Sequence, residues 1–246
     1  MSTELTGLFQ DIDTGSEELA KEELSNGGGS SYVNDNGVFK GTIERCFITP
    51  TKKGGVALTL HTKDSGYSTT IYPVTVRDGK KVTTYTYKGK EQSLQDYKML
   101  KQLYFVITGK ACELKDIKIE EQELTYKEYG KDVTVKAGVL VDLIGKEFNF
   151  GVRLEEQYNY EDGEVDKTSL KTNNNGDVVY KQTLFSVYSK SGKTAMELVK
   201  KEEAKQIEKD REFLASDKAT KRVKLDIAEI EDDVVDNIQE PDEIDF

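Results

Sequence analysis

The chain has 246 residues, of which 36% are apolar and 33% are charged, and its formal net charge is −11. No apolar run approaches the roughly 20 residues of a membrane helix, and the first residues, MSTELTGLFQD, lack the basic segment and long apolar stretch of a signal peptide. Cys46, Cys112 and His61 give three possible ligands where a closed zinc site needs four. We therefore expect a cytoplasmic protein without metal or cofactor, built as one domain with tails.

The first 31 residues form an acidic appendage with seven acidic side chains and one lysine. Glu17–Leu24 is a candidate short helix with Ser16 as its cap. Ser25–Ser31, SNGGGSS, has the composition of a flexible linker. We therefore predict that residues 1–31 are flexible and lie outside the domain that follows.

From Gly37 onward the chain alternates in the manner of β-strands. Four strands are predicted here: Val38–Thr49, Val56–Thr62, Tyr67–Val76 and Lys80–Lys88. Gly41 interrupts the first strand and indicates a bulge or a sharp bend. Pro50–Gly55 is a turn, and Asp78–Gly79 is a strong two-residue hairpin signal.

A short helix follows these strands. The predicted helix and the two strands after it are Leu94–Leu103, Tyr104–Thr108 and Cys112–Leu124. Ser93 is the candidate cap of the helix, and Leu94, Tyr97 and Leu100 are spaced to bury one of its faces. Strands, one helix and further strands is the order of an OB-fold, a five-stranded Greek-key barrel. We therefore predict a mainly β, OB-fold-like barrel over residues 32–224, with an extra β extension and a C-terminal helix.

The second half of this domain keeps alternating. Three further strands are predicted: Val133–Ile144, Glu147–Leu154 and Val178–Tyr188. Glu155–Asp177 is polar and rich in Gly and Asn, which predicts a long exposed loop or a β-hairpin arm. Glu197–Ala215 is a predicted helix with a solvated, charged face, and Lys218–Lys224 (KATKRVK) is interpreted as a basic hinge into the tail.

Enzymatic chemistry has little support in the sequence. The phosphate-loop, dinucleotide, zinc-protease and serine-hydrolase motifs are all missing. His61 lies in an alternating strand, where a structural or surface role is expected. We predict a non-catalytic protein, although metal-dependent nucleases need only Asp, Glu and Lys and so stay open.

The predicted hairpin Tyr67–Lys90 concentrates tyrosines and cations. On its return strand Lys81, Thr83, Tyr85 and Tyr87 share one face, which we expect to be directed at solvent. Such rings can stack on bases while cations contact phosphates, although Tyr and Thr are also good strand formers. The candidate DNA-binding residues, of which the first two occupy the turn after the first strand, are Lys52, Lys53, Tyr67, Tyr72, Arg77, Lys80, Lys81, Tyr85, Tyr87, Lys88 and Lys90.

The charge of the chain is segregated. Residues 1–31 carry a net −6 and the last 22 residues carry −10, so residues 32–224 carry a net +5. A basic body with a detachable acidic tail suits a nucleic-acid binder, because the tail can occupy the groove when nucleic acid is absent.

The last segment, Leu225–Phe246, reads LDIAEIEDDVVDNIQEPDEIDF and holds ten acidic residues without a basic one. So dense an acidic run is typically disordered, and its recurring apolar residues suit a peptide that folds into a partner's groove. Phe246 puts a ring and a carboxylate at one point, which a basic, apolar pocket can capture together. The candidate partner-binding residues are Asp242, Glu243, Ile244, Asp245 and Phe246. A merely solubilising acidic tail is the alternative.

An acidic tail closed by Asp245 and Phe246 resembles the ends of bacterial and phage single-stranded-DNA-binding proteins. The resemblance implies an OB-fold body that coats and protects single-stranded DNA in phage replication, recombination and repair, within the host cytoplasm. It also implies that the tail recruits replication proteins such as a DNA polymerase, a helicase or primase, or a nuclease. Two alternatives stay open: a phage structural or assembly protein built on a β-barrel, and a strand-annealing recombination protein that assembles as rings. A homo-oligomer is compatible with each.

Overall fold

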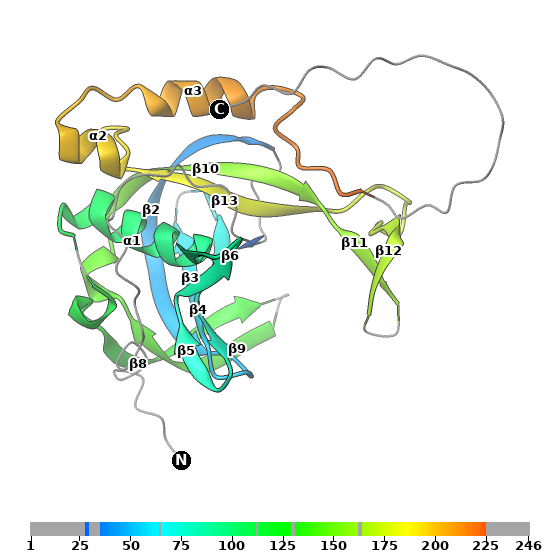
Figure 1. Cartoon of the computed structure of the whole chain (residues 1–246), viewed down its shortest axis with the longest axis horizontal. Coiled ribbons are helices and arrows are strands. Elements are labelled where there is room, and N and C mark those ends of the chain that lie inside the picture. Colours follow the sequence, from blue (N-terminus) through cyan, green and yellow to red (C-terminus); the bar gives the residue numbers. More distant parts are fainter. Residues whose placement is uncertain are drawn as a thin grey trace.

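The computed structural model describes residues 28–29, 35–63, 65–111, 113–128, 131–161 and 164–224. These residues form a mainly β structure in which one antiparallel sheet curls around a core and a few helices lie against it (Figure 1). The predicted mainly β class is therefore confirmed. Within these ranges no helix has both the length and the apolar character needed to cross a membrane.

One long strand organises the sheet. It is β2 (Gly37–Pro50), and its two main partners are β3 (Val56–Thr62) and β10 (Glu147–Glu156). β2 pairs with β10 up to Thr42 and with β3 from Ile43 onward. Gly41 lies at this change of partner, where an added Cβ would come within 3.0 Å of the Phe150 ring and the Thr62 methyl group. The glycine therefore lets the strand bend closely over the core, where a larger residue would displace these side chains.

The strand pairings return to their starting point. The other strands of this sheet are β1 (Gly28–Gly29), β4 (Ser68–Arg77), β5 (Lys80–Val82), β8 (Glu120–Glu128), β9 (Lys131–Val139) and β13 (Tyr180–Tyr188). Pairings run from β2 through β3, β4, β1 and β13 to β10, which pairs with β2 again, while β9 and β8 extend the sheet from the later half of β2. β1 is antiparallel to both β4 and β13. The predicted linker Ser25–Ser31 thus contributes a short strand to the sheet.

The core lies inside the curled sheet and beneath helix α1 (Gln95–Thr108). Three aromatic rings stack at its centre, with Phe150 4.9 Å from Tyr67 and 5.2 Å from Phe148 between ring centroids. Helix α1 adds Leu100 and Leu103, which are fully buried. Burial of side chains of this size contributes about 1.5–3 kcal/mol each, so this cluster is a principal source of stability.

Helix α1 is longer than predicted and begins differently. The expected strand Tyr104–Thr108 is wrong, because Tyr104 and Val106 are buried as part of the helix and tertiary contacts override the β preference of these residues. Ser93 does not cap the helix: it ends strand β7, and the cap position is Leu94, which makes no side-chain capping bond.

The predicted return strand Lys80–Lys88 is divided in two. Its parts and the strand after them are β5 (Lys80–Val82), β6 (Thr84–Tyr87) and β7 (Lys90–Ser93). β5 pairs with β4, whereas β6 and β7 form a separate hairpin. Thr83 lies between β5 and β6, is fully buried, and accepts a 2.7 Å hydrogen bond from the Leu94 amide through its carbonyl. The prediction that Thr83 shares a solvent-directed face with Lys81 is therefore wrong.

Two other predicted strands are shortened. The segment expected from Cys112, which lies outside the described residues, becomes a 3-10 turn at Leu114–Asp116 before β8 begins at Glu120. The strand expected to reach Ile144 ends at Val139 and is followed by a second 3-10 turn, Val141–Leu143. The predicted strands Glu147–Leu154 and Val178–Tyr188 are confirmed as β10 and β13, with small changes at their ends.

The long polar segment after β10 contains a hairpin arm, and the helical region after β13 is interrupted. The arm is formed by β11 (Tyr158–Glu161) and β12 (Glu164–Leu170). The helical region consists of α2 (Ala195–Lys200) and α3 (Gln206–Leu214). The arm projects from the body and the helices lie over β10 and β13 (Figure 1). The single helix predicted over Glu197–Ala215 is thus wrong in its middle, since Lys201 adopts a left-handed conformation with φ 57° and ends α2.

Residues Ala219–Lys224, here named the strap, lie along the end of β10. Lys221 forms a parallel bridge with Glu155, and its amide donates a 2.9 Å hydrogen bond to the Leu154 carbonyl. The interpretation of Lys218–Lys224 as a hinge is therefore wrong for its later part, which is bound to the sheet.

Glu197 ties the two C-terminal helices together. Its carboxylate accepts backbone hydrogen bonds from Thr194, Lys205 and Gln206 at 2.7–2.8 Å. Burial opposes the charge, but these hydrogen bonds outweigh it and hold the Glu197 pKa below its ordinary value of 4.5. A depressed pKa means that the carboxylate stabilises the folded protein at neutral pH, and that this stabilisation is lost as the pH falls through the lowered pKa.

We predict that Glu197→Gln lowers the free energy of unfolding at pH 7 by about 1–3 kcal/mol, because buried amides lose their charged acceptor. The difference between variant and parent should shrink as the pH falls through the lowered pKa of Glu197, where the parent carboxylate becomes protonated. Urea unfolding followed by circular dichroism over a series of pH values from 7 downward measures this. Glu203→Gln, at an exposed position in the same connection, is the matched control and should change stability by less than about 0.5 kcal/mol. Equal effects of the two variants would contradict the prediction.

Candidate nucleic-acid interface

Two basic turns meet at one end of β3 and β4. Lys52 and Lys53 are exposed in the turn between β2 and β3, which is closed by a 2.9 Å hydrogen bond from the Thr51 amide to the Gly55 carbonyl. This turn lies against the end of β4, where a Cβ on Gly55 would stand 2.5 Å from the Val74 carbonyl oxygen. Glycine is needed for so close an approach of two backbones.

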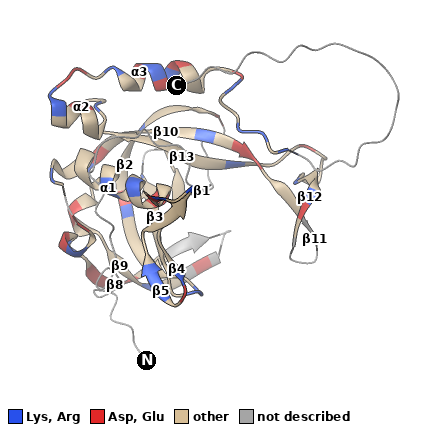
Figure 2. Cartoon of the chain, viewed as in Figure 1, with Lys and Arg blue, Asp and Glu red and all other residues tan. Residues whose placement is uncertain are grey.

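The second basic turn is the β4–β5 hairpin. Its turn residues Asp78 and Gly79 have φ values of 49° and 75°, as a two-residue hairpin with the twist of its strands requires. The hairpin places Arg77 opposite Lys80. Five cations therefore belong to the two turns that adjoin here, and the ribbon at this end of β4 and β5 carries the blue of Lys and Arg (Figure 2). We name them the basic end: Lys52, Lys53, Arg77, Lys80 and Lys81.

The β6–β7 hairpin adds two tyrosines beside the basic end. The Arg77 guanidinium lies 5.8 Å from the centre of the Tyr85 ring, which ties this hairpin to the end of β4. Tyr85 is half-buried and its hydroxyl donates a 2.8 Å hydrogen bond to the Gln92 side chain. Tyr87 is 53% exposed, with the Lys88 ammonium 5.4 Å from its ring centre. Tyr87 is therefore the more open of the two rings. Lys90 is exposed opposite it.

The face of β3 and β4 that points away from the core is polar and shallow. Thr59 and Thr70 are cross-strand partners on this face, with hydroxyl oxygens 3.2 Å apart. Tyr72 follows on β4 and is 51% exposed, while its backbone amide donates a 2.7 Å hydrogen bond to Asp96 at the start of α1. Short threonines beside an open ring leave room for a flat ligand to lie across the strands.

The β8–β9 hairpin closes one side of this face. Phe47 of β2 is only 1% exposed, because it packs in a small apolar cluster with residues of β8 and β9. Its ring also stacks on His61 of β3 at 6.1 Å. Burial, with a smaller contribution from Arg45, lowers the pKa of His61. The imidazole is therefore neutral at physiological pH and adds no charge to the face.

Most of the predicted site residues lie at the surface, but Tyr67 does not. Tyr67 is fully buried and stacks on Phe150, so its proposed role as a stacking platform is wrong. Burial also raises the pKa of its hydroxyl. Tyr67 was predicted as a site residue because it begins the tyrosine-rich hairpin, whereas Tyr67, Thr69 and Ile71 are all buried on the inner side.

Sequence reasoning missed a second group of surface residues near the root of the arm. Tyr180 is 42% exposed at the start of β13, and Lys181 follows it opposite Glu155 of β10. Arg222 of the strap and Tyr180 line the same open hollow of about 490 Å³. The sequence signal that could have predicted this group is a tyrosine followed by a lysine directly after the Gly- and Asn-rich loop.

The described residues offer little for covalent or metal chemistry. Among them, no three His, Cys, Asp or Glu side chains are grouped so as to hold a metal ion. Cys46 is buried, and burial raises the pKa of its thiol to about 12, so the thiol stays protonated at neutral pH. The predicted partner-binding residues Asp242, Glu243, Ile244, Asp245 and Phe246 lie outside the described residues.

We predict opposite effects for two tyrosines that are close in sequence. Tyr67→Ala removes a central core ring and should lower the free energy of unfolding by about 3–5 kcal/mol. Tyr72→Ala removes an exposed ring and should cost less than about 1 kcal/mol. Urea unfolding followed by circular dichroism measures both values. A large loss of stability for Tyr72→Ala would show that its ring is needed for folding and would remove it from the surface site.

Comparison with known proteins adds no family to this geometry. No protein-family model matches the chain, and neither a curated protein nor a solved structure matches it. The function of the surface must therefore be argued from its own residues: a basic end, open tyrosines and a polar sheet face.

Proposed function

We propose that this protein binds single-stranded DNA without catalysing a reaction on it. The observation that carries this function is the basic end lying beside the hairpin of Tyr85 and Tyr87, with the open Tyr72 ring farther along β4 on the polar outer face of β3 and β4. Single-strand binders combine cations that follow the backbone with aromatic rings on which bases stack. A duplex keeps its bases stacked inside, so it cannot use these rings in the same way.

We further propose that the curled sheet is an OB-fold. In this assignment β2, β3, β4, β10 and β13 are its five strands in chain order, and α1 lies between the third and the fourth. Because β1 is antiparallel to both β4 and β13, the third and fifth strands run parallel to each other. Binding by an OB-fold uses the face of strands two and three and the loops after strands one and four. These are the β3–β4 face, the Lys52–Lys53 turn and the loop that carries the arm.

The binding mechanism follows from the distribution of charge and rings. Phosphates lie along the basic end, while bases rest on Tyr72 and Tyr87 and against the short Thr59 and Thr70 side chains. Stacking does not distinguish one base from another, so binding has little sequence preference. In the replication, recombination and repair of a phage genome, such binding coats and protects the strand.

The acidic segment Leu225–Phe246 completes the proposed function. Its ten carboxylates compete with phosphates for the basic end, and DNA sets the segment free. Phe246 then serves as the anchor for a replication partner such as a polymerase, helicase or nuclease, because a ring and a carboxylate at one point fit a basic, apolar pocket.

The direct test is titration of a fluorescent oligo-dT and of a duplex of equal length. We expect the single strand to bind much more tightly. The logarithm of its binding constant should fall with the logarithm of salt concentration by about 0.7 for each phosphate neutralised. Equal affinity for duplex and single strand would contradict the stacking mechanism. Absence of binding at low salt would favour a structural or assembly role instead.

Substitution of the rings locates the site within this titration. Tyr72→Ala and Tyr87→Ala should each weaken oligo-dT binding, since a stacked base contributes about 1–3 kcal/mol. Tyr104→Phe, which removes a hydroxyl bonded to Asp142 away from this face, is the matched control and should bind normally. If neither ring matters while the fold stays intact, the strand lies elsewhere.

We predict that deleting Leu225–Phe246 strengthens oligo-dT binding at low salt, because an internal competitor is removed and the net charge rises from −11 to about −1. The gain should shrink above 0.1 M salt, where the Debye length is about 10 Å or less. Removal of Phe246 alone should leave DNA affinity nearly unchanged and should abolish pull-down of the replication partner. Unchanged DNA affinity after the full deletion would show that the segment does not compete with DNA.

A further inference from the structure

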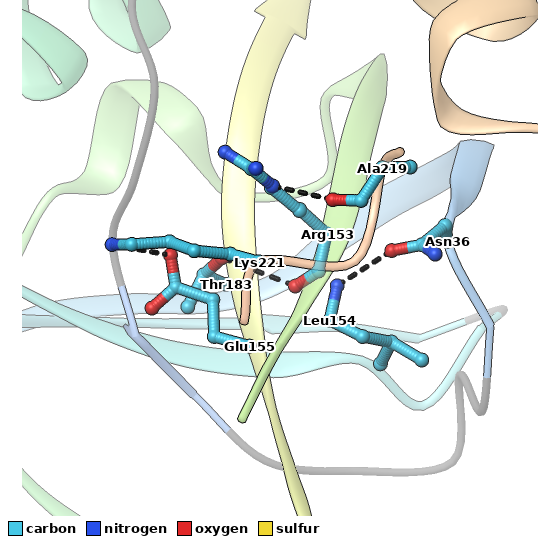
Figure 3. Close-up of polar contacts among 7 residues, drawn as sticks. All are labelled: Asn36, Arg153, Leu154, Glu155, Thr183, Ala219 and Lys221. Atoms are coloured by element: carbon cyan, nitrogen blue, oxygen red, sulfur yellow. Dashed lines mark hydrogen bonds and ion pairs between the residues drawn. The ribbon is translucent and has the colours of Figure 1, made fainter. Parts of the chain in front are cut away.

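The strap completes the sheet at a place that β2 does not reach. β2 pairs with β10 only as far as the Gly37–Val152 pair, so the last four residues of β10 have no partner strand on that side. The Asn36 side chain accepts a 2.7 Å hydrogen bond from the Leu154 amide, and the strap takes over beyond it (Figure 3). Lys221 then receives a 2.9 Å hydrogen bond from the Glu156 amide at its carbonyl.

Side chains fasten both ends of the strap, yet its backbone attachment is short. The Arg153 Nε donates a 2.6 Å hydrogen bond to the Ala219 carbonyl, and the Tyr158 hydroxyl donates one of 2.7 Å to the Lys224 carbonyl. Between these points a single parallel bridge joins the strap to β10. An edge segment held this way opens at a much lower free energy than the core.

A negatively charged carboxylate helps to hold the strap, and the phosphates of DNA carry the same sign of charge. Lys221 lies 3.2 Å from the Glu155 carboxylate, and both side chains are partly exposed. Glu155 also faces Lys181 across the β10–β13 pair, so one carboxylate stands between two lysines. Phosphates along this surface can compete with Glu155 as the counterion of Lys221, because the Lys221 side chain is 46% exposed.

The position of the strap connects the candidate groove to the acidic segment. The Tyr158 bond places Lys224 at the root of the arm, in the loop that the OB-fold assignment puts at one end of the DNA-binding face. The acidic segment begins at the next residue. The contacts that hold the strap on β10 therefore also fix the position of Lys224, the residue that precedes the acidic segment.

We propose that the strap is a detachable strand whose docking on β10 and the binding of single-stranded DNA exclude each other. DNA at the arm end of the groove takes Lys221 and Arg222 from the β10 edge, the strap leaves Leu154 and Glu156, and the start of the acidic segment moves away from the groove. This inference rests on the proposed DNA binding and adds to it the element through which DNA releases the acidic segment.

Amide hydrogen exchange tests the release directly. With saturating oligo-dT, the amides of Lys221 and Glu156 should exchange about tenfold faster or more, because their mutual hydrogen bonds with β10 and the strap are lost. Amides of β3 and β4 should exchange more slowly in the same sample. Slower or unchanged exchange at Lys221 and Glu156, together with protection of β3 and β4, would overturn the strap inference while leaving DNA binding intact. No protection anywhere would instead contradict the proposed function.

A disulfide lock gives the second measurement. Asn36 and Thr220 meet side by side, with Nδ2 and Oγ1 3.0 Å apart, so Asn36→Cys with Thr220→Cys can join the strap to the sheet without touching its cations or Glu155. Cys112→Ser removes one competing thiol, and Cys46 is buried and protonated. Because coupling is reciprocal, the oxidised protein should bind oligo-dT about fivefold or more weakly than the same protein reduced. Equal affinities with the disulfide shown to be formed would overturn the inference.

Substitution of Glu155 tests its role as the counterion of Lys221. Glu155→Gln loosens the strap and should tighten oligo-dT binding. Glu147→Gln is the control for overall charge, since it removes a carboxylate from the same strand that is paired with Lys190 at 2.5 Å and lies at the end of β10 remote from the strap. Both variants reduce the negative charge by one. A gain at Glu155 no larger than that at Glu147 would mean that only overall charge matters and would overturn the inference.

Discussion

The bend of β2 is the constraint on which the other features depend. Strand β2 pairs with β10 along its first half and with β3 along its second half. It can bend between these partners because Gly41 has no side chain to clash with Phe150 and Thr62. This one crossing joins the two ends of the sheet and encloses the stacked aromatic core. The register of β2 against β3 shifts once between Ile43 and Arg45, and the unshifted pairing from Arg45 to Pro50 then decides which face of β3 turns outward.

The division of the chain into a rigid core and a polar outer face follows from this register. Alternate residues of β3 and β4 enter the core, and those between them include Thr59 and His61 of β3 and Thr70 and the open Tyr72 of β4. Charges are kept to the ends of the strands, where glycine-containing turns bring the basic end together. The arm and the strap lie at the edges of this scaffold, outside the packed core.

The sequence predicted the strands with clear alternation and the turns with distinctive chemistry. Asp78–Gly79 and the bend at Gly41 are local signals, and both occupy the positions expected of them. The prediction for Thr83 is wrong because alternation says which residues share a face but not where a strand breaks. The prediction for Tyr67 is wrong because richness in tyrosine does not say which ring is buried. The segment Tyr104–Thr108 favours a strand locally and is helical because its buried face meets the core. The OB-fold itself stays a proposal.

The strap could not be predicted, for a different reason. Its residues ATKRVK have no strand-like alternation, and their docking depends on the length by which β10 extends past β2. That length is set by residues far away in the chain. Basic composition favoured a hinge, whereas Lys221 pairs with Glu155 of the same molecule.

The closure of the sheet also determines the order in which the chain can fold. The first half of β2 finds its partner in β10 more than 100 residues later, and β1 pairs with β13 nearer still to the end of the chain. Contacts so distant in sequence form slowly, because a long loop must be ordered before they are gained. β2, β3 and β4 can pair soon after they are synthesised, whereas the ring cannot close until β13 has been made. During synthesis the edge of β2 near Gly37 therefore stays open until β10 has been made, and the edge of β1 stays open until β13 has been made. These are edges at which another strand could pair wrongly.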